Sequence, residues 1–133
     1  MTEAPAFDAS NTPFESIGGE PAVRTLVDAF YDRMDTAPEA ADIRAMHPDD
    51  LTESRDKLFK FLCGWLGGPQ YYIAQYGHPR LRMRHAPFAI DESARDAWLS
   101  CMTYAMDAQS IDGALRAFLD QRFTHVADFM RNR

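Results

Sequence analysis

The chain has 133 residues, 46% of them hydrophobic, and a formal net charge of −6. This length supports one domain whose core needs neither disulfides nor a structural metal. Because a general phosphate-backbone binder needs a basic face, the acidic balance argues against a nucleic-acid-binding protein. No apolar run approaches the roughly 18 residues of a membrane-spanning helix, so we expect no membrane span.

The cysteines and the N-terminal residues bear on the cellular compartment in which the protein is expected. Cys63 and Cys101 each lie inside an apolar helical pattern. Residues 1–5 show neither the basic nor the apolar region of a secretory signal peptide. We therefore expect buried thiols and a cytoplasmic protein.

The N-terminal third contains an irregular segment and then a strong helical pattern. Residues 1–15 contain prolines and small polar residues with little periodicity, which predicts an extended arm ahead of one domain over 16–133. Pro21 suits the first turn of a helix. The apolar residues that follow share one helical stripe, formed by Val23, Leu26, Val27, Phe30, Tyr31 and Met34.

Three further long helices are predicted. The first begins at Asp50 or Thr52 and ends before the Gly-Gly-Pro of residues 67–69, and residues 70–76 are expected to form a loop. The next begins at residues 91–93, and the last follows a break at 110–113. No stretch of six or more residues alternates as a half-buried strand would, so the predicted fold class is all-α.

Residues 77–88 contain two histidines, three arginines and two prolines. Pro79 suits the start of a helix and Pro87 disfavours its continuation, so a helix of about two turns is predicted, with His85 in its last turn. An imidazole there can donate one ring N–H to a carbonyl and keep the other nitrogen for a metal. The neighbouring arginines would suit the propionates of a haem. A histidine at a helix end is nevertheless more often a cap or a solvated side chain, and composition alone leaves both interpretations open.

Two aromatic residues are candidates for binding a polar ligand. Tyr31 lies in the stripe of the first long helix, and Trp98 lies on the inward face of the third. A buried hydroxyl or indole N–H needs an acceptor, which a diatomic ligand on iron would supply. Core packing explains each residue as well, and Lys57 and Arg84 are equally compatible with solvated charges or with contacts to propionates.

Short motifs follow one another along residues 14–128. They are Ile17-Gly18-Gly19, Phe30-Tyr31, His47-Pro48, Asp49-Asp50-Leu51, Phe61-Leu62, Leu66-Gly67-Gly68-Pro69, Gly77-His78-Pro79, Arg84-His85, Pro87-Phe88 and Asp96-Ala97-Trp98-Leu99. Each motif is weak alone, but in this order and spacing the set is specific. The chain resembles a group II truncated haemoglobin, which implies the two-over-two helical sandwich of a shortened globin and haem b as cofactor.

The resemblance also implies roles, position by position. His85 takes the place of the proximal histidine that ligates iron, Tyr31 that of the distal tyrosine, and Trp98 that of a second distal donor. His47 matches a position usually held by phenylalanine or tyrosine, where it could donate to the ligand, bind iron itself or remain a solvated loop histidine. The other matched positions wall the pocket (Ser54, Leu58, Phe61 and Leu62) or reach the propionates (Lys57, Tyr72 and Arg84).

The expected function is reversible, high-affinity binding of O2 and of related ligands such as NO and CO. The alternative is a redox enzyme, a nitric oxide dioxygenase or peroxidase-like protein, which would need an external reductase because the chain has no Gly-x-Gly-x-x-Gly fingerprint. A third hypothesis, from another class, is a haem-free helical interaction module. The sequence leaves O2 transport open, as well as the choice between monomer and homodimer.

Overall fold

The computed structural model describes residues 11–80, 83 and 85–132, and among these residues it contains helices and no β-strand. This confirms the predicted all-α fold class. The helices are α1 (Pro13–Ile17), α2 (Gly19–Thr36), the 3-10 helix η1 (Pro38–Ala40), α3 (Ala41–Ala45), α4 (Thr52–Trp65), α5 (Tyr71–Tyr76), α7 (Glu92–Ala108) and α8 (Gly113–Met130).

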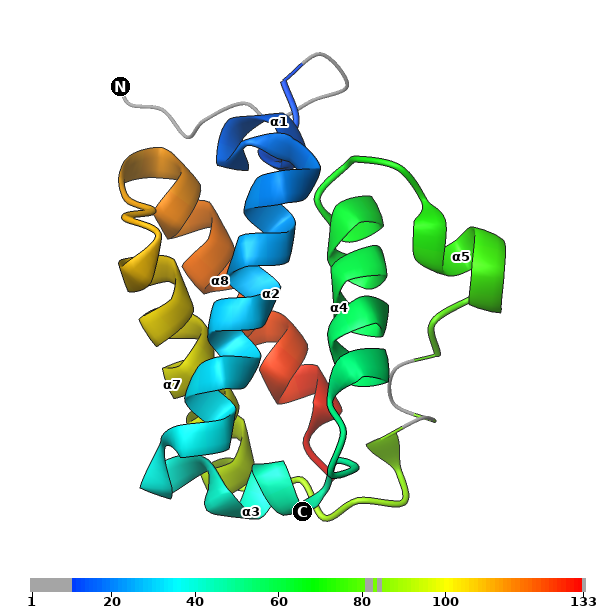
Figure 1. Cartoon of the computed structure of the whole chain (residues 1–133), viewed down its shortest axis with the longest axis vertical. Coiled ribbons are helices and arrows are strands. Elements are labelled where there is room, and N and C mark those ends of the chain that lie inside the picture. The colour runs from blue at the N-terminus through cyan, green and yellow to red at the C-terminus, as the bar shows by residue number, and fades with distance from the viewer. Residues whose placement is uncertain (1–10, 81–82, 84, 133) are drawn as a thin grey trace.

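The long helices form two antiparallel pairs. Figure 1 shows α2 running opposite to α4, and α7 running opposite to α8. Helix α2 packs against both α4 and α7 and so joins the two pairs. This arrangement is the expected two-over-two helical sandwich. None of the described helices combines the length and the apolar composition needed to cross a membrane.

The core lies where α2 meets α4 and α7. The predicted apolar stripe of α2 is buried along its whole length, and Phe30 is fully inaccessible. Cys63 and Cys101 are also buried, which confirms the expectation for the thiols. Their burial raises the pKa of each thiol to about 11, so both remain protonated at neutral pH.

Helix starts agree with the capping signals in the sequence. Helix α4 begins at Thr52, whose N–H donates to the Asp50 carboxylate at 2.9 Å. Helix α7 has Asp91 as its N-cap, and the Asp91 side chain accepts a hydrogen bond from the Ala94 N–H at 2.8 Å. These carboxylates satisfy N–H groups that have no partner within the helix.

The loop expected over residues 70–76 is wrong, because residues 71–76 form helix α5. One turn apart on this helix, Tyr72 and Tyr76 have ring centroids 4.9 Å apart, and Tyr72 also meets Phe61 of α4 at 6.1 Å. The aromatic contacts with α4 favour a helical turn that the local sequence did not signal.

The extended segment expected to reach residue 15 ends earlier. Thr12 caps helix α1 by accepting a hydrogen bond from the Glu15 N–H at 3.1 Å, and the Phe14 N–H donates to the Leu66 carbonyl at 2.9 Å. Residues 13–15 therefore belong to the folded body, whereas residues 1–10 lie outside the described part of the chain.

Replacing Gly68 by alanine should destabilise the fold, because the added Cβ would lie 2.6 Å from ring atoms of Phe14. Overpacking of this kind costs about 1–3 kcal/mol. The matched control is Gly64→Ala, whose Cβ would meet only the flexible end of Gln70. We expect a lower urea midpoint for Gly68→Ala and a change within about 1 kcal/mol for Gly64→Ala. Equal midpoints for the two variants would contradict the packing of α1 on this turn.

Candidate functional site

Tyr31 is buried near the C-terminal end of α2, with 6% of its surface exposed. Its ring meets Phe30 edge-on at 5.0 Å and His47 at 5.8 Å. Burial raises the pKa of its hydroxyl to about 12, an effect that the positive charge of Arg55 partly opposes. Within the described part of the chain the hydroxyl has no hydrogen-bond partner. Tyr31 is therefore a protonated, poorly solvated donor with no protein acceptor among these residues.

Trp98 lies on α7, and its ring and the Tyr31 ring both contact the ring of Phe30. Its ring meets Phe30 at 5.3 Å and Phe123 of α8 at 5.8 Å, both near edge-on. The side chain is half-buried and packs on the core. Core packing thus accounts for its ring, while its indole N–H has no hydrogen-bond acceptor among the described residues.

His47 is half-buried between α3 and α4. Its Nδ1 lies 2.8 Å from the Ile43 carbonyl oxygen, which can only accept, so Nδ1 carries the proton. Its pKa is lowered chiefly by burial and also by the charges of Arg44 and His85, against the opposing effect of the Ile43 hydrogen bond. The neutral imidazole is therefore favoured, and its Nε2 keeps a lone pair.

His85 is helical and half-buried. Its carbonyl accepts hydrogen bonds from the Phe88 N–H at 3.0 Å and from the Asn132 side chain at 3.4 Å. Of the predicted two-turn helix around it, residues 81, 82 and 84 lie outside the described part of the chain. The predicted propionate contact Arg84 therefore lies outside it too.

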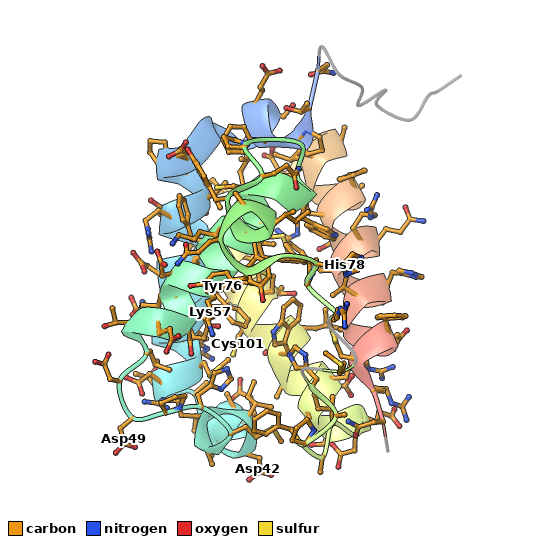
Figure 2. The ribbon with its side chains drawn as sticks, turned by 90° about the vertical axis from the view of Figure 1, so that its right-hand side faces the viewer. Asp42, Asp49, Lys57, Tyr76, His78 and Cys101 are labelled. Atoms are coloured by element: carbon orange, nitrogen blue, oxygen red, sulfur yellow. The ribbon has the colours of Figure 1, made fainter. Side chains whose placement is uncertain are left out.

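The remaining predicted residues belong to α4 and α5. Leu62 and Tyr72 are buried, whereas Ser54, Lys57, Leu58 and Phe61 are half-buried along α4. The Lys57 Nζ pairs with Glu53 at 3.2 Å and lies 5.3 Å from the centre of the Tyr76 ring. Lys57 and Tyr76 are labelled in Figure 2. Tyr72 also contacts Tyr76, so Lys57 of α4 and Tyr72 of α5 share one aromatic neighbour.

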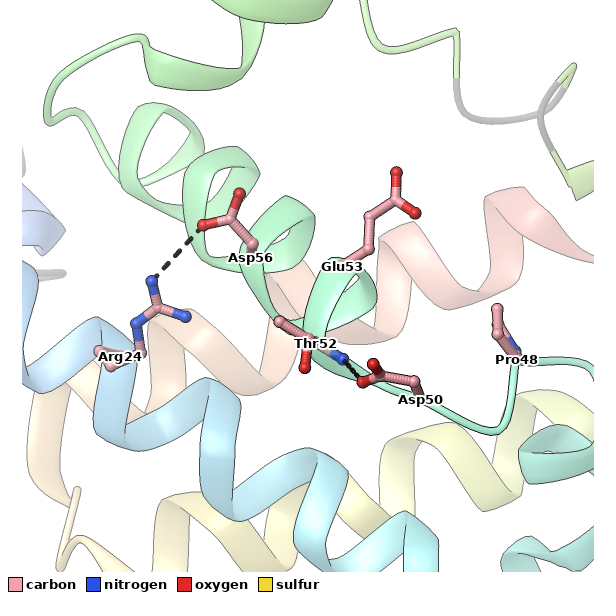
Figure 3. A pocket seen from close by; sticks show the side chains of 6 residues that line it. All are labelled: Arg24, Pro48, Asp50, Thr52, Glu53 and Asp56. Carbon is pink, nitrogen blue, oxygen red and sulfur yellow. Dashed lines mark hydrogen bonds and ion pairs between the residues drawn. The ribbon is translucent and has the colours of Figure 1, made fainter.

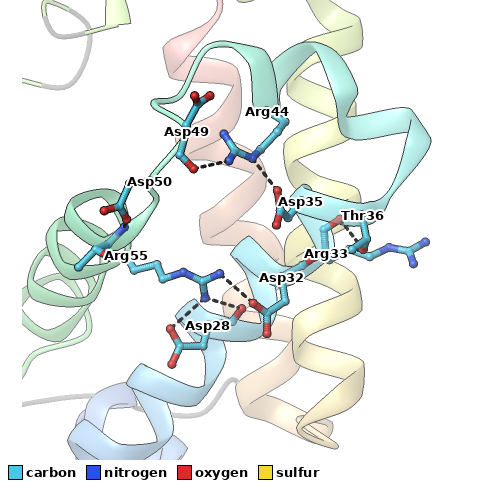
Figure 4. A network of polar contacts seen from close by, with 10 residues as sticks. Asp28, Asp32, Arg33, Asp35, Thr36, Arg44, Asp49, Asp50 and Arg55 are labelled. Atoms are coloured by element: carbon cyan, nitrogen blue, oxygen red, sulfur yellow. Dashed lines mark hydrogen bonds and ion pairs between the residues drawn. The ribbon is translucent and has the colours of Figure 1, made fainter.

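Arg55 is a residue of the site that the sequence analysis missed. Its guanidinium donates to Asp28 at 3.2 Å and to Asp32 at 2.8 Å, and thereby ties α4 to α2 (Figure 4). Its central carbon lies 5.8 Å from the centre of the Tyr31 ring. The signal in the sequence was the pair Asp28 and Asp32, one helical turn apart on either side of Tyr31.

A surface hollow of about 610 Å³ lies beside the start of α4. It is lined by Arg24, Pro48, Asp50, Thr52, Glu53 and Asp56 (Figure 3). An ion pair of 3.6 Å between Arg24 and Asp56 crosses it. It contains none of the predicted haem-site residues, and carboxylates predominate in its lining, which would disfavour an anionic ligand.

The fold and the described contacts define a class of protein, the globins. A model of the family described as Bacterial-like globin matches residues 12–132, which is most of the chain. As a member of this class the chain is a haem-binding protein.

Comparison with individual relatives shows which group of globins the chain belongs to. The group 2 truncated haemoglobin YjbI of Bacillus subtilis (strain 168) is 44% identical over 122 residues, which cover 92% of this chain and 89% of the relative. A cold-adapted truncated haemoglobin from Pseudoalteromonas haloplanktis TAC125 matches in structure with a TM-score of 0.89 and 43% identity, over 92% of this chain and 98% of the other. A truncated oxygen-avid haemoglobin from Bacillus subtilis matches with a TM-score of 0.85 and 44% identity, over 92% and 100% of the two chains. The chain therefore belongs to the bacterial-like globins and, among them, to the group II truncated haemoglobins.

In the haem-free chain, the Tyr31 hydroxyl should lose its proton only at an unusually high pH. Its folded-state pKa of about 12 exceeds its ordinary value of 10.0, so its burial stabilises the fold below pH 10 and this contribution disappears as the pH rises to 12. The loss is about 3 kcal/mol. Near-ultraviolet titration of tyrosinate should show one late group that Tyr31→Phe removes.

Tyr71 supplies the control, because its exposed hydroxyl also has a raised pKa, caused by its hydrogen bond with Glu20. Tyr71→Phe should leave the latest titrating group in place. If Tyr31→Phe removed a tyrosine that titrates near 10, Tyr31 would not be buried as described.

Proposed function

We propose that the chain holds haem b with His85 as the axial ligand and reversibly binds O2, or a related ligand such as NO or CO, with high affinity. When bound, the haem supplies an iron position at which a diatomic ligand can coordinate. The observation that carries the proposal is the hydroxyl of the buried Tyr31 side chain, which is protonated and has no acceptor among the described residues. The oxygen-avid relative from Bacillus subtilis supports the choice of O2.

Tyr31 and Trp98 stabilise the ligand as hydrogen-bond donors. A diatomic ligand held by a haem would present a partly negative acceptor, and donors such as Tyr31 and Trp98 in a poorly solvated site would interact with it more strongly than water does. Because the pKa of Tyr31 is about 12, its hydroxyl keeps its proton across the physiological pH range. Phe30, which contacts both rings, keeps the two donors apart and in place.

His47 serves this site chiefly as an acceptor. Its Nδ1–H already donates to the Ile43 carbonyl, so the neutral ring presents Nε2 as a lone pair. While no external ligand is bound, this nitrogen is suited to accept from the Tyr31 hydroxyl, whose ring lies 5.8 Å away, or to bind iron itself. Donation to the ligand would require protonation, which burial disfavours.

The residues of α4 and α5 complete the pocket. Leu58, Phe61 and Leu62 provide apolar walls that exclude water, and Ser54 provides a small neighbour on the distal side. Lys57 and Tyr72, with Arg84, bind the propionates. For Lys57 this requires exchanging its exposed partner Glu53 for a propionate oxygen, a small cost for a surface ion pair.

Loss of either donor should speed the release of O2. We expect the dissociation rate, measured by stopped flow from the oxygenated ferrous protein, to rise about tenfold or more in Tyr31→Phe and in Trp98→Phe, since a hydrogen bond to a charged group contributes about 1.5–3 kcal/mol. The matched control is Trp65→Phe, because Trp65 also stacks on Phe123, at 5.2 Å, but its ring is not paired with the ring of Phe30 or of Tyr31 among the described residues.

An unchanged dissociation rate in both donor variants would contradict the proposed roles of Tyr31 and Trp98. An equal increase in Trp65→Phe would attribute the effect to core packing. Sustained NO consumption by the wild-type protein with an external reductase would favour the redox enzyme over reversible binding.

A further inference from the structure

Asn132 joins the end of the chain to the segment that follows the proximal histidine candidate. We call residues 85–90 the proximal segment. The Asn132 N–H donates to the Ile90 carbonyl at 2.9 Å, and its side-chain oxygen accepts from the Ile90 N–H at 2.9 Å. Its side-chain nitrogen donates to the carbonyls of Phe88 at 2.9 Å and His85 at 3.4 Å.

The asparagine amide suits this position because it presents a donor and an acceptor together. The carbonyls of His85 and Phe88 lie where a short helical turn has ended, and the His85 carbonyl accepts there from the Phe88 N–H as well as from Asn132. The Asn132 amide nitrogen provides donors for these carbonyls, while its oxygen holds the next backbone N–H in the same segment. One side chain therefore fixes both ends of the proximal segment.

The position of Asn132 is itself determined by helix α8. This helix ends at Met130, and Arg131 adopts an extended backbone that leads the chain away from the helix axis. Two residues before the helix ends, Asp128 pairs with Arg95 of α7 at 2.6 Å. The end of α8 is therefore held on α7, and Asn132 is held in turn against the proximal segment.

We propose that Asn132 is a positioning residue for His85. By fixing the proximal segment, it sets where the His85 imidazole stands relative to the haem iron and how tightly the protein retains haem. This inference rests on the proposed role of His85 as the axial ligand. Asn132 itself is remote from the distal donors on α2 and α7 in the chain and acts only through the backbone that carries His85.

Two substitutions separate the components of this contact. Asn132→Asp keeps the oxygen that accepts from Ile90 but replaces the nitrogen donor by a second oxygen facing two carbonyls. Asn132→Ala removes all three side-chain hydrogen bonds, those with Ile90, Phe88 and His85, and keeps the backbone bond from the Asn132 N–H to the Ile90 carbonyl. The matched control is Asp128→Asn, which weakens the contact of α8 with α7 without touching the proximal segment.

The test uses the haem-loaded, full-length protein in its ferrous form. Resonance Raman spectroscopy reports the stretching of the iron–histidine bond, and transfer to an apoglobin acceptor reports the rate of haem loss. We expect Asn132→Asp and Asn132→Ala to shift or broaden the iron–histidine band and to speed haem loss about tenfold, which corresponds to ~1.4 kcal/mol. Asp128→Asn, which keeps every contact of the Asn132 side chain, should change the band less than either Asn132 variant.

Amide hydrogen exchange provides a readout that does not depend on the haem iron. The Ile90 N–H should exchange faster in Asn132→Ala, which lacks its acceptor, than in Asn132→Asp, which retains one. Faster exchange in Asn132→Ala, together with the shifted band, would attribute the effect to the contact and not to general unfolding.

An iron–histidine band and a rate of haem loss that are unchanged in both Asn132 variants would overturn this inference alone. A shift of equal size in Asp128→Asn would overturn it as well, because loosening of α8 would then suffice. A wild-type protein without a band that depends on His85 would overturn the proposed function, and this inference with it.

Discussion

Phe30 is buried completely where α2 crosses α7, and its ring meets the edge of Tyr31 on its own helix and of Trp98 on the facing helix. Neighbouring residues on a helix point about 100° apart, so the burial of Phe30 in the core directs Tyr31 towards His47 at the border of the core. The main helix contact of the fold therefore also fixes both proposed donors. Stability and the proposed ligand binding therefore involve the same aromatic cluster.

Two arginines form hydrogen bonds beside this aromatic cluster. Arg55 ties α4 to the two aspartates that flank Tyr31 on α2. Arg44 donates to Asp35 and to the Asp49 carbonyl, each at 2.8 Å (Figure 4). It also donates to the Pro48 carbonyl at 2.9 Å. These bonds fix the turn directly after His47. The negative net charge of the chain thus includes carboxylates that position the distal side through arginine.

Local sequence signals predicted much of this structure. The apolar stripe of α2, the capping aspartate of α7 and the burial of Tyr31 follow from periodicity and helix-end chemistry, which act over a few residues. The sequence placed Lys57 and Tyr72 at the propionates only through the resemblance, and those roles stay predictions.

Features that depend on contacts between distant segments could not be predicted. Helix α5 was expected as a loop because its aromatic contact with α4 leaves no local periodicity. Arg55 and Asn132 escaped notice because their partners lie 23 to 47 residues away in the chain. A lone asparagine two residues after a helix has no pattern of its own, and its role emerges only when the proximal segment packs beside it.

The central claim is that His85 is the axial ligand of a haem whose other side is open to a diatomic ligand. The most direct measurement is the visible absorption spectrum of the haem-loaded protein, ferric and ferrous, for wild type, His85→Ala and His47→Ala. We predict a five-coordinate ferrous spectrum that His85→Ala abolishes or strongly alters and that His47→Ala preserves. A haem spectrum that survives His85→Ala unchanged, or the absence of specific haem uptake by the wild-type chain, would contradict the claim.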